Sequence, residues 1–143
     1  MLPVTHCIIY FSTSSWSFTS EDIQDILQQS RSRNAQVGIT GVLLYMHGHI
    51  IQVLEGDKPA VDDLFERIKK DTRHKQVICV LNQSIKAHLF SQWSMGYETL
   101  TTQQFDEIRT IIDLDKPKPV SETENESAIV KTLRGFYKIN HQL

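Results

Sequence analysis

The feature that most restricts the fold of this chain is a pair of apolar runs, VLLYM and HIIQVLEG, on either side of the dipeptide His47-Gly48. Two such runs joined by two residues, with glycine in second place, are typical of a tight β-hairpin. With this turn centre, Leu43 faces Gln52 and Tyr45 faces Ile50 across the two strands. The sequence therefore predicts both a hairpin and its register.

A strand and a helix are predicted before the hairpin. Residues 5–12 are short, apolar and rich in β-branched side chains, as in a strand. Thr19 lies three residues before Asp22, a spacing typical of a helix start. We expect the chain to leave this helix over residues 31–38. The helical stripe between these points consists of Ile23, Ile26, Leu27 and Ser30.

A second helix and two more strands are predicted after the hairpin. Pro59 is tolerated in the first turn of a helix, and the apolar residues that follow have helical spacing: Val61, Leu64, Phe65 and Ile68. Residues 77–81 predict a buried strand and residues 93–100 another. The order β-α-β-β-α-β-β predicts an α+β fold, a ferredoxin-like mixed sheet with two helices on one face.

The C-terminal region is expected to cover the other face, which is not stable when open to water. A polar, proline-containing linker lies near residues 115–127. We therefore expect residues 1–100 to form the main domain and residues 101–143 a C-terminal helical cap. Two helices are predicted in this cap from the spacing of Phe105, Ile108 and Ile112 and of Ile129, Leu133 and Phe136.

Composition excludes several classes of protein. The chain has 143 residues and a formal net charge of −2, so we expect no basic face for nucleic acid. No apolar run approaches the roughly eighteen residues of a membrane span, and residues 1–10 lack the pattern of a signal peptide. Cys7 and Cys79 lie in apolar runs, as expected of buried thiols in a reducing compartment. We therefore expect a soluble, cytoplasmic protein.

Common catalytic and metal-binding motifs are missing from the sequence. There is no GxGxxG, GxxxxGK, GxSxG or CxxC pattern, which argues against a phosphate-binding loop, a serine hydrolase and dithiol chemistry. His47 and His49 lie at the predicted turn with no third ligand near them in the sequence, so we expect no metal site.

Two polar residues stand out within the apolar strands. Gln52 lies in a strand expected near the centre of the sheet, where each unpaired group of a buried amide costs about 1–3 kcal/mol. Tyr10 is likewise a polar residue in an apolar strand, where its hydroxyl needs a hydrogen-bond partner, and its phenol is redox-active. On facing strands the two side chains either satisfy each other or point at a polar ligand. The alternative is that Gln52 lies at an exposed edge or bonds to neighbouring backbone.

Four further polar residues have ordinary structural interpretations. Asn34 follows the first predicted helix, where asparagine commonly caps the C-terminus. Arg67 and Asp71 are four apart on the second helix, the spacing of an exposed ion pair worth about 0.3–0.5 kcal/mol. Arg33 is expected to be solvated. The pattern as a whole predicts polar side chains aimed into an apolar cleft between two helices, which is a default ligand site.

Five motifs, in order along the chain, resemble the BLUF family of flavin-binding blue-light sensors. They are IYFS at residues 9–12, Asn34 followed by GITG, IQVLEG at residues 51–56, Arg67 followed by DTRH, and Trp93-Ser-Met95. The resemblance covers about residues 4–100 and implies that residues 1–100 are a flavin-binding BLUF domain. It implies the ferredoxin-like fold, with the flavin between the two helices, and FAD as cofactor, with FMN and riboflavin left open.

The resemblance also assigns roles to individual residues. Tyr10 matches the phenol that gives an electron to the photoexcited flavin. Gln52 matches the amide between that phenol and the flavin, whose hydrogen bonds rearrange and shift the absorption to the red. Asn34 matches a side chain that hydrogen-bonds the polar edge of the ring, and Arg33 occupies a variable position beside it. The resemblance further implies cofactor contacts for Arg67 and Asp71 and lining positions for Ile26, Ser30, Ile39, Thr40 and His74.

Output in the family involves the strand with the tryptophan and the methionine, which exchange places near the glutamine. Trp93 and Met95 alternate by two and share one face of the predicted strand, whereas Ser94 points away. The sequence given ends without a cyclase or phosphodiesterase segment, so we expect the short type of family member, which is not an enzyme. That type implies an unidentified effector protein, a homo-oligomer and an interface within residues 105–143.

Two other classes of function are left open by the residues themselves. One is an enzyme, either a flavin oxidoreductase or an acylphosphatase-like hydrolase, although a hydrolase of that kind needs an arginine that residues 11–18 lack. The other is a cofactor-free interaction module in which Tyr10 and Gln52 only satisfy each other. A yellow protein whose absorption shifts reversibly to the red in blue light would favour the sensor.

Overall fold

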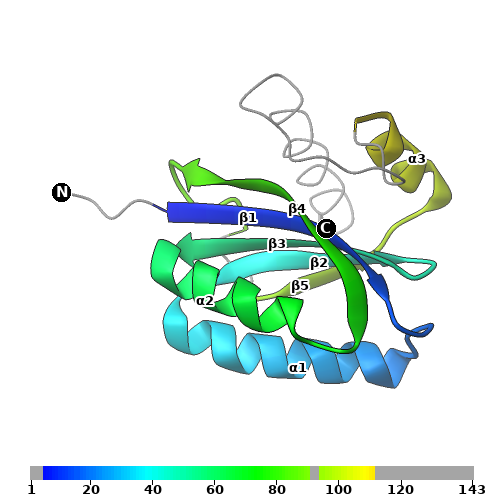
Figure 1. Cartoon of the computed structure of the whole chain (residues 1–143), viewed down its shortest axis with the longest axis horizontal. Coiled ribbons are helices and arrows are strands. Elements are labelled where there is room, and N and C mark those ends of the chain that lie inside the picture. Colours follow the sequence, from blue (N-terminus) through cyan, green and yellow to red (C-terminus); the bar gives the residue numbers. More distant parts are fainter. Residues whose placement is uncertain (1–4, 91–93, 112–143) are drawn as a thin grey trace, which may run out of the picture.

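The computed structural model of the chain describes residues 5–90 and 94–111 (Figure 1). The strands hydrogen-bond in the order β4-β1-β3-β2-β5, with β2 and β5 parallel and the other neighbours antiparallel. This mixed sheet confirms the predicted α+β, ferredoxin-like fold. The elements in chain order are β1 (Thr5–Ser14), α1 (Ser20–Val37), β2 (Thr40–Met46), β3 (His49–Asp57), α2 (Lys58–Lys69), β4 (His74–Ile85), β5 (Gly96–Thr99) and α3 (Thr102–Ile111).

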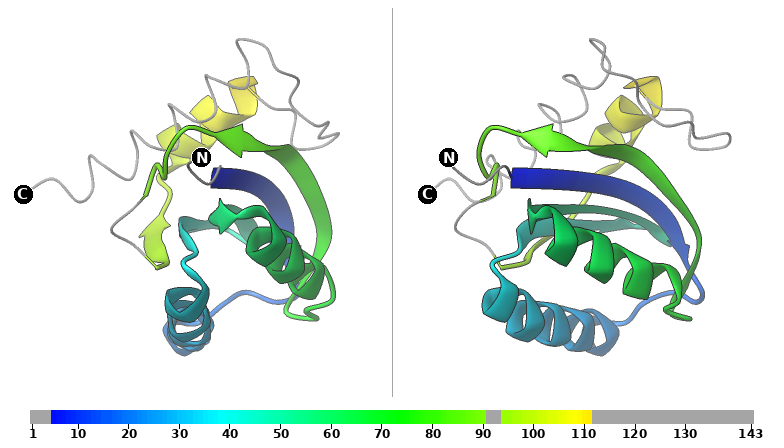
Figure 2. Two further views of the ribbon diagram at one scale, coloured as in Figure 1. Left: turned by 90° about the vertical axis from the view of Figure 1, so that its left-hand side faces the viewer. Right: turned by 60° about the vertical axis from the view of Figure 1, so that its left-hand side comes forward.

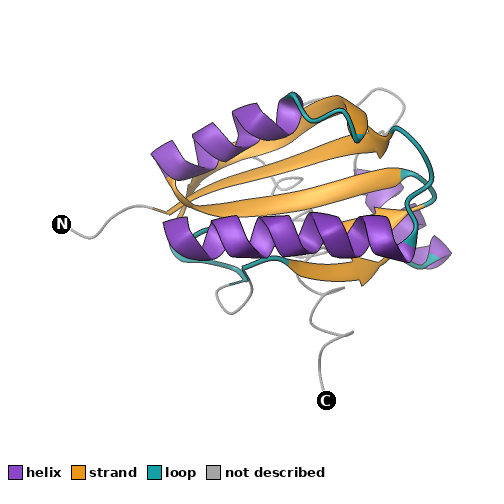
Figure 3. Ribbon diagram, turned by 90° about the horizontal axis from the view of Figure 1, so that it is seen from below, coloured by secondary structure: helices purple, strands orange, loops and turns teal. Residues whose placement is uncertain are grey.

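Helices cover both faces of the sheet. Figure 2 shows α1 and α2 on one side and α3 on the other, and Figure 3 shows α1 and α2 running side by side along the strands. Alternate residues of the central strands accordingly belong to two separate hydrophobic clusters. Ile8 and Leu54 pack on the side of α1 and α2, whereas Ile9 and Val53 pack on the side of α3.

The hairpin has the predicted register. Leu43 pairs with Gln52 and Tyr45 pairs with Ile50, because the left-handed backbone of the turn, with a φ of 84° at Gly48, suits glycine. β3 is the middle strand of the five. Gln52 is therefore buried, and the alternative of an exposed edge is excluded.

Helix α1 starts as predicted but ends later. The Thr19 hydroxyl accepts from the Asp22 N–H and the Asp22 carboxylate accepts from the Thr19 N–H, which makes a capping box. The expectation that the chain leaves the helix over residues 31–38 was wrong, since α1 continues to Val37. Gly38, with a φ of 71°, ends it and donates its N–H to the Asn34 carbonyl. Glycine adopts this left-handed conformation without steric cost, so the helix stops one residue before it.

The last strand is shorter than predicted, and one predicted tail helix is present. β5 begins at Gly96, so Ser94 and Met95 precede the strand. Helix α3 follows Thr101, whose hydroxyl accepts from the Gln104 N–H, and it buries Phe105 and Ile108 against the sheet. The second predicted tail helix and the linker near residues 115–127 lie outside the described residues.

Candidate functional site

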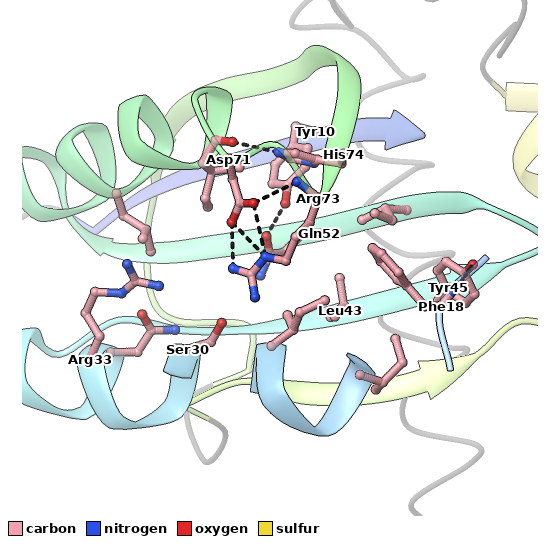
Figure 4. Close-up of a pocket in the computed structure, with 16 residues that line it drawn as sticks. Tyr10, Phe18, Ser30, Arg33, Leu43, Tyr45, Gln52, Asp71, Arg73 and His74 are labelled. Atoms are coloured by element: carbon pink, nitrogen blue, oxygen red, sulfur yellow. Dashed lines mark hydrogen bonds and ion pairs between the residues drawn. The ribbon is translucent and has the colours of Figure 1, made fainter. Parts of the chain in front are cut away.

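A cavity opens between α1 and α2 on the face of the sheet (Figure 4). It encloses about 630 Å³ of empty space, including the open solvent at its mouth. The central strands form its floor and the two helices its walls. Eight residues named as candidates from the sequence line it, namely Tyr10, Ile26, Ser30, Arg33, Asn34, Gln52, Asp71 and His74.

Three other sequence candidates lie elsewhere. Ile39 and Arg67 line a smaller cavity, which shares Arg33 and Asn34 with the main one. Thr40 lines neither cavity, and its hydroxyl instead donates to Glu55 Oε1 at 2.8 Å.

Tyr10 and Gln52 meet at the floor of the main cavity. They are directly paired on β1 and β3, both are buried, and the Tyr10 hydroxyl donates to Gln52 Oε1. Burial raises the pKa of the Tyr10 phenol far above its ordinary value, and the negative charge of Asp71 raises it further. The phenol therefore keeps its proton and directs it at the amide oxygen.

Gln52 also contacts the segment that leads into β5. Its amide nitrogen, Nε2, donates to the sulfur of Met95 at 3.3 Å. Met95 is only 1% exposed, so the amide joins the Tyr10 phenol to a buried side chain next to β5. Of the three predicted signalling residues, Met95 contacts Gln52, Ser94 contributes its carbonyl to Asn34, and Trp93 lies outside the described residues.

Asn34 is not the cap of helix α1, which corrects the interpretation made from the sequence. It lies inside the helix and is 1% exposed, and its Nδ2 donates to the Ser94 carbonyl at 2.8 Å. Among the described residues, two buried atoms of the cavity wall have no hydrogen-bond partner, namely Asn34 Oδ1 and Arg33 Nε. Arg33 is thus half-buried rather than solvated. The wall offers one acceptor and one donor to a ligand.

The predicted ion pair between Arg67 and Asp71 does not form. Helix α2 ends at Lys69, so Asp71 lies beyond it, and Arg67 instead pairs with Asp63 at 2.8 Å on the surface. Asp71 instead forms an ion pair with Arg73, with 2.6 Å between Asp71 Oδ2 and Arg73 Nη2. Arg73 Nε also donates to both oxygens of the Asp71 carboxylate. Hydrogen bonds from Arg73 lower the pKa of the Asp71 carboxyl, and Asp71 in turn raises the pKa of Arg73.

His74 lies beside Tyr10 at the same end of the cavity. Its Nε2 donates to the Ile68 carbonyl at 2.6 Å, and its Nδ1 lies 2.8 Å from Ser12 Oγ. The imidazole and the Tyr10 ring meet edge to face, with 6.0 Å between centroids. His74 therefore ties the end of α2 to β1 next to the phenol.

Sequence reasoning missed part of the lining. Phe18 comes from the loop before α1 and stacks on Tyr45, with 5.2 Å between ring centroids. That loop has no periodic pattern, so no local signal marks Phe18. Arg73 belongs to the DTRH motif at residues 71–74, but the resemblance assigns it no role. Its position two residues after Asp71 could have indicated the ion pair between them.

Two classes of site receive no support from the described part of the chain. Residues 5–90 and 94–111 contain no group of three or more His, Cys, Asp or Glu side chains that could hold a metal ion. Within the same residues, none of the helices has the length and apolar character needed to cross a bilayer.

Comparisons with known proteins agree on one family. The profile described as "BLUF: Sensors of blue-light using FAD" matches residues 5–96. Photoactivated adenylate cyclase subunit beta of Euglena gracilis is 35% identical over 93 residues, which cover 64% of this chain and 11% of that protein. The corresponding protein of Euglena longa is 34% identical over 93 residues, with the same coverage. The chain thus spans about a tenth of the length of these curated relatives.

Solved structures similar to this chain include proteins of about its own size. BlrB, a BLUF protein in its dark state, has a TM-score of 0.71 and 29% identity, covering 95% of this chain and 99% of that one. BlsA in its photo-activated state has a TM-score of 0.76 and 29% identity, covering 91% of this chain and 94% of that one. A bacterial light-regulated adenylyl cyclase has a TM-score of 0.67 and 27% identity, covering 94% of this chain and 36% of that one. With its profile matched over residues 5–96, the chain belongs to the BLUF family, the sensors of blue light that use FAD.

Proposed function

We propose that this chain is a flavin-based blue-light photosensor in which Tyr10 is the electron donor and Gln52 is the switch. The observation that carries the proposal is the buried hydrogen bond from the Tyr10 phenol to the Gln52 amide at the floor of the cavity. A redox-active phenol and a reorientable amide, both sheltered from water, are the groups that such a switch needs.

The residues of the cavity fit a flavin. The unpartnered Asn34 Oδ1 accepts a hydrogen bond and the unpartnered Arg33 Nε donates one, and the polar edge of a flavin ring carries an N–H group and carbonyl oxygens. Buried polar groups are normally satisfied, so a ligand with both functions stabilises this wall. Ile23, Ile26 and Leu64 supply apolar surface for the ring. We propose FAD as the flavin, with FMN and riboflavin to be separated by mass spectrometry of the extracted cofactor.

A bound flavin supplies absorption of blue light and an excited state that accepts an electron. With a flavin bound in the cavity, the Tyr10 phenol would be the group of the chain that gives up this electron. A phenol that has lost an electron is a far stronger acid, and its proton has an acceptor in contact, Gln52 Oε1. When the electron and the proton return to Tyr10, the Gln52 amide is left with a changed set of hydrogen bonds.

The changed amide alters the contact with Met95. In the arrangement described above, Gln52 Nε2 donates to the Met95 sulfur. A rearranged amide that presents oxygen to this sulfur loses the hydrogen bond, because both atoms are then acceptors. We propose that Met95 and β5 carry this change to an effector protein, that the chain is not itself an enzyme, and that it works in the cytoplasm as a homo-oligomer.

The experiment is an absorption spectrum of the purified protein before and after blue light. We expect a yellow protein with flavin bands that shift to the red and recover in the dark. The Gln52→Leu variant should bind flavin and lose the shift, because it has no amide to rearrange. A full shift in that variant would remove Gln52 from the mechanism, and steady NADH consumption in the dark would favour a flavin oxidoreductase.

A further inference from the structure

Glu55 is a fully buried carboxylate on the same strand as Gln52. Its exposed fraction is 0%, and it lies three residues from Gln52 on β3. Side chains alternate along a strand, so Glu55 points to the face opposite the cavity. Burial of a carboxylate costs free energy unless the group is well hydrogen-bonded. The presence of Glu55 within β3 therefore indicates that its contacts have a specific function.

Glu55 accepts three hydrogen bonds, and His88 Nδ1 lies 3.8 Å from its Oε1. Oε2 accepts from the Leu89 N–H at 2.7 Å, and Oε1 accepts from the Phe90 N–H at 2.6 Å and from the Thr40 hydroxyl at 2.8 Å. This acceptor-only set suits an ionised carboxylate. Because the single Thr40 proton goes to Glu55, His88 Nδ1, at 2.5 Å, must donate to Thr40 Oγ1. Glu55 thus binds the main chain at residues 89–90 to β3.

Phe90 lies five positions before Met95 in the sequence, and Met95 is the residue that Gln52 contacts. Four residues after Phe90, the Ser94 carbonyl accepts from Asn34, and the Met95 carbonyl accepts from Arg31 Nε at 2.8 Å. Helix α1 therefore fixes the main chain at residues 94–95, and Glu55 fixes it at residues 89–90. The Met95 side chain, in contact with Gln52, lies next to the first of these points.

We propose that Glu55 is a positioning residue that anchors residues 89–90 to β3, so that a change at Gln52 acts on Met95 against a fixed support. The inference rests on the proposed function, because it concerns how the response of Gln52 is transmitted. With the anchor in place, Met95 can rearrange only within tightly packed surroundings, which slows its return. With the anchor released, residues 89–90 are no longer held to β3 and the return is faster.

The first test is the rate of dark recovery of FAD-loaded protein after blue light. Glu55→Gln keeps the shape of the side chain but replaces one acceptor oxygen by an NH₂ group, which opposes a backbone donor. We expect recovery at least ten times faster than in the wild type. The control is Lys86→Ala, an exposed residue of the same loop, which leaves Thr40, His88 and all three hydrogen bonds to Glu55 in place and should recover within twofold of the wild type. Recovery of Glu55→Gln within twofold of the wild type would overturn the proposal.

A double-mutant cycle separates positioning from a general loss of stability. In a Met95→Leu background the side chain has no sulfur to accept from Gln52. If Glu55 acts through this segment, adding Glu55→Gln to that background should change the recovery rate less than twofold. A tenfold acceleration that persists in the background would show that Glu55 acts by another route and would overturn the proposal.

Amide hydrogen exchange of the wild type keeps the inference testable if Glu55→Gln fails to fold. The Leu89 and Phe90 amides should be equally protected in the dark and under blue light, and loss of protection of either amide in the light would overturn the anchor. The two proposals fail in different ways. A wild type without a light-induced shift contradicts the proposed function, whereas a normal shift with unchanged recovery in Glu55→Gln contradicts only the anchor.

Discussion

Tyr10, Gln52 and Glu55 are buried polar side chains of the neighbouring strands β1 and β3, and each has a specific partner. Tyr10 and Gln52 contact each other, while Glu55 accepts two backbone N–H groups of the loop after β4. Such groups are retained in a core only when their hydrogen bonds are made. Those of Tyr10 and Gln52 lie at the cavity, and those of Glu55 lie on the other face.

The Tyr10→Phe variant should bind flavin and lose the light-induced red shift. Phenylalanine fills the same space but is a much poorer electron donor, and it has no hydroxyl to donate to Gln52. The measurement is the difference between light and dark absorption spectra. Tyr97→Phe is the control, because the Tyr97 hydroxyl lies on β5 near Thr99 and outside the cavity. A wild-type shift in Tyr10→Phe would show that another residue is the donor.

The Asp71–Arg73 pair should make stability depend on pH in the acidic range. Because the pKa of Asp71 is lowered in the folded state, its contribution is complete above the ordinary Asp pKa of about 3.9. The contribution is then lost as the pH falls through the lower folded-state pKa. Both side chains are about one-third exposed, 29% for Asp71 and 32% for Arg73, so we expect a contribution of at most about 1 kcal/mol.

The free energy of unfolding, measured by urea titration between pH 6 and pH 2, tests this dependence. Asp71→Asn should show a shallower fall below pH 4 than the wild type. Parallel curves for the two proteins would mean that Asp71 does not contribute to the acid sensitivity.

At the scale of elements, glycine is required for different reasons at two positions close to the hairpin. Gly41 lies where β2 passes β3, and an added Cβ would be 1.9 Å from the Val53 carbonyl oxygen. Gly38 ends α1 with a φ of 71°, and an added Cβ there would have no heavy atom within 4 Å. The first position requires glycine because of space and the second because of backbone conformation.

We expect Gly41→Ala to lower the free energy of unfolding by about 3 kcal/mol, because backbone must move to relieve the contact. Gly38→Ala should lower it by about 1–2 kcal/mol, the cost of a left-handed conformation for alanine. Chemical denaturation of both variants tests the comparison. Equal losses would mean that the close approach of β2 and β3 relaxes without cost.

At the scale of the whole molecule, the sheet separates two hydrophobic clusters, one around the cavity and one packed under α3. The cluster under α1 and α2 surrounds the cavity. The cluster under α3 contains Phe105 and Ile108 and is made of packed apolar side chains. Loss of the packing of α3 on the second face should therefore reduce stability without changing the light-induced red shift.

Ile108, which is 0% exposed, gives the test. Ile108→Ala should lower the free energy of unfolding by about 2–5 kcal/mol and Ile108→Val by about 0.5–1.5 kcal/mol. Both should keep the wild-type red shift at temperatures where they are folded. A changed shift in Ile108→Val would show that α3 is coupled to the cavity in the dark state.

The sequence by itself determined the hairpin and its register, the start of α1, the order of the elements and the presence of Tyr10 and Gln52 within apolar strands. These features depend on turn residues, caps and periodic spacing, all of which act within a few positions along the chain. The motif resemblance added the family, because five short motifs in order are specific together even though each is weak alone.

Only the tertiary structure decided the remaining features of the site. The Glu55 carboxylate meets a backbone donor 34 positions away, and the Asn34 amide meets a carbonyl 60 positions away. The sequence suggested a helix cap for Asn34 and a partner in Asp71 for Arg67, because it offers only nearby residues as candidates. Which polar atoms are buried, and which two in the cavity wall lack a partner, is fixed only when distant elements pack together and exclude water.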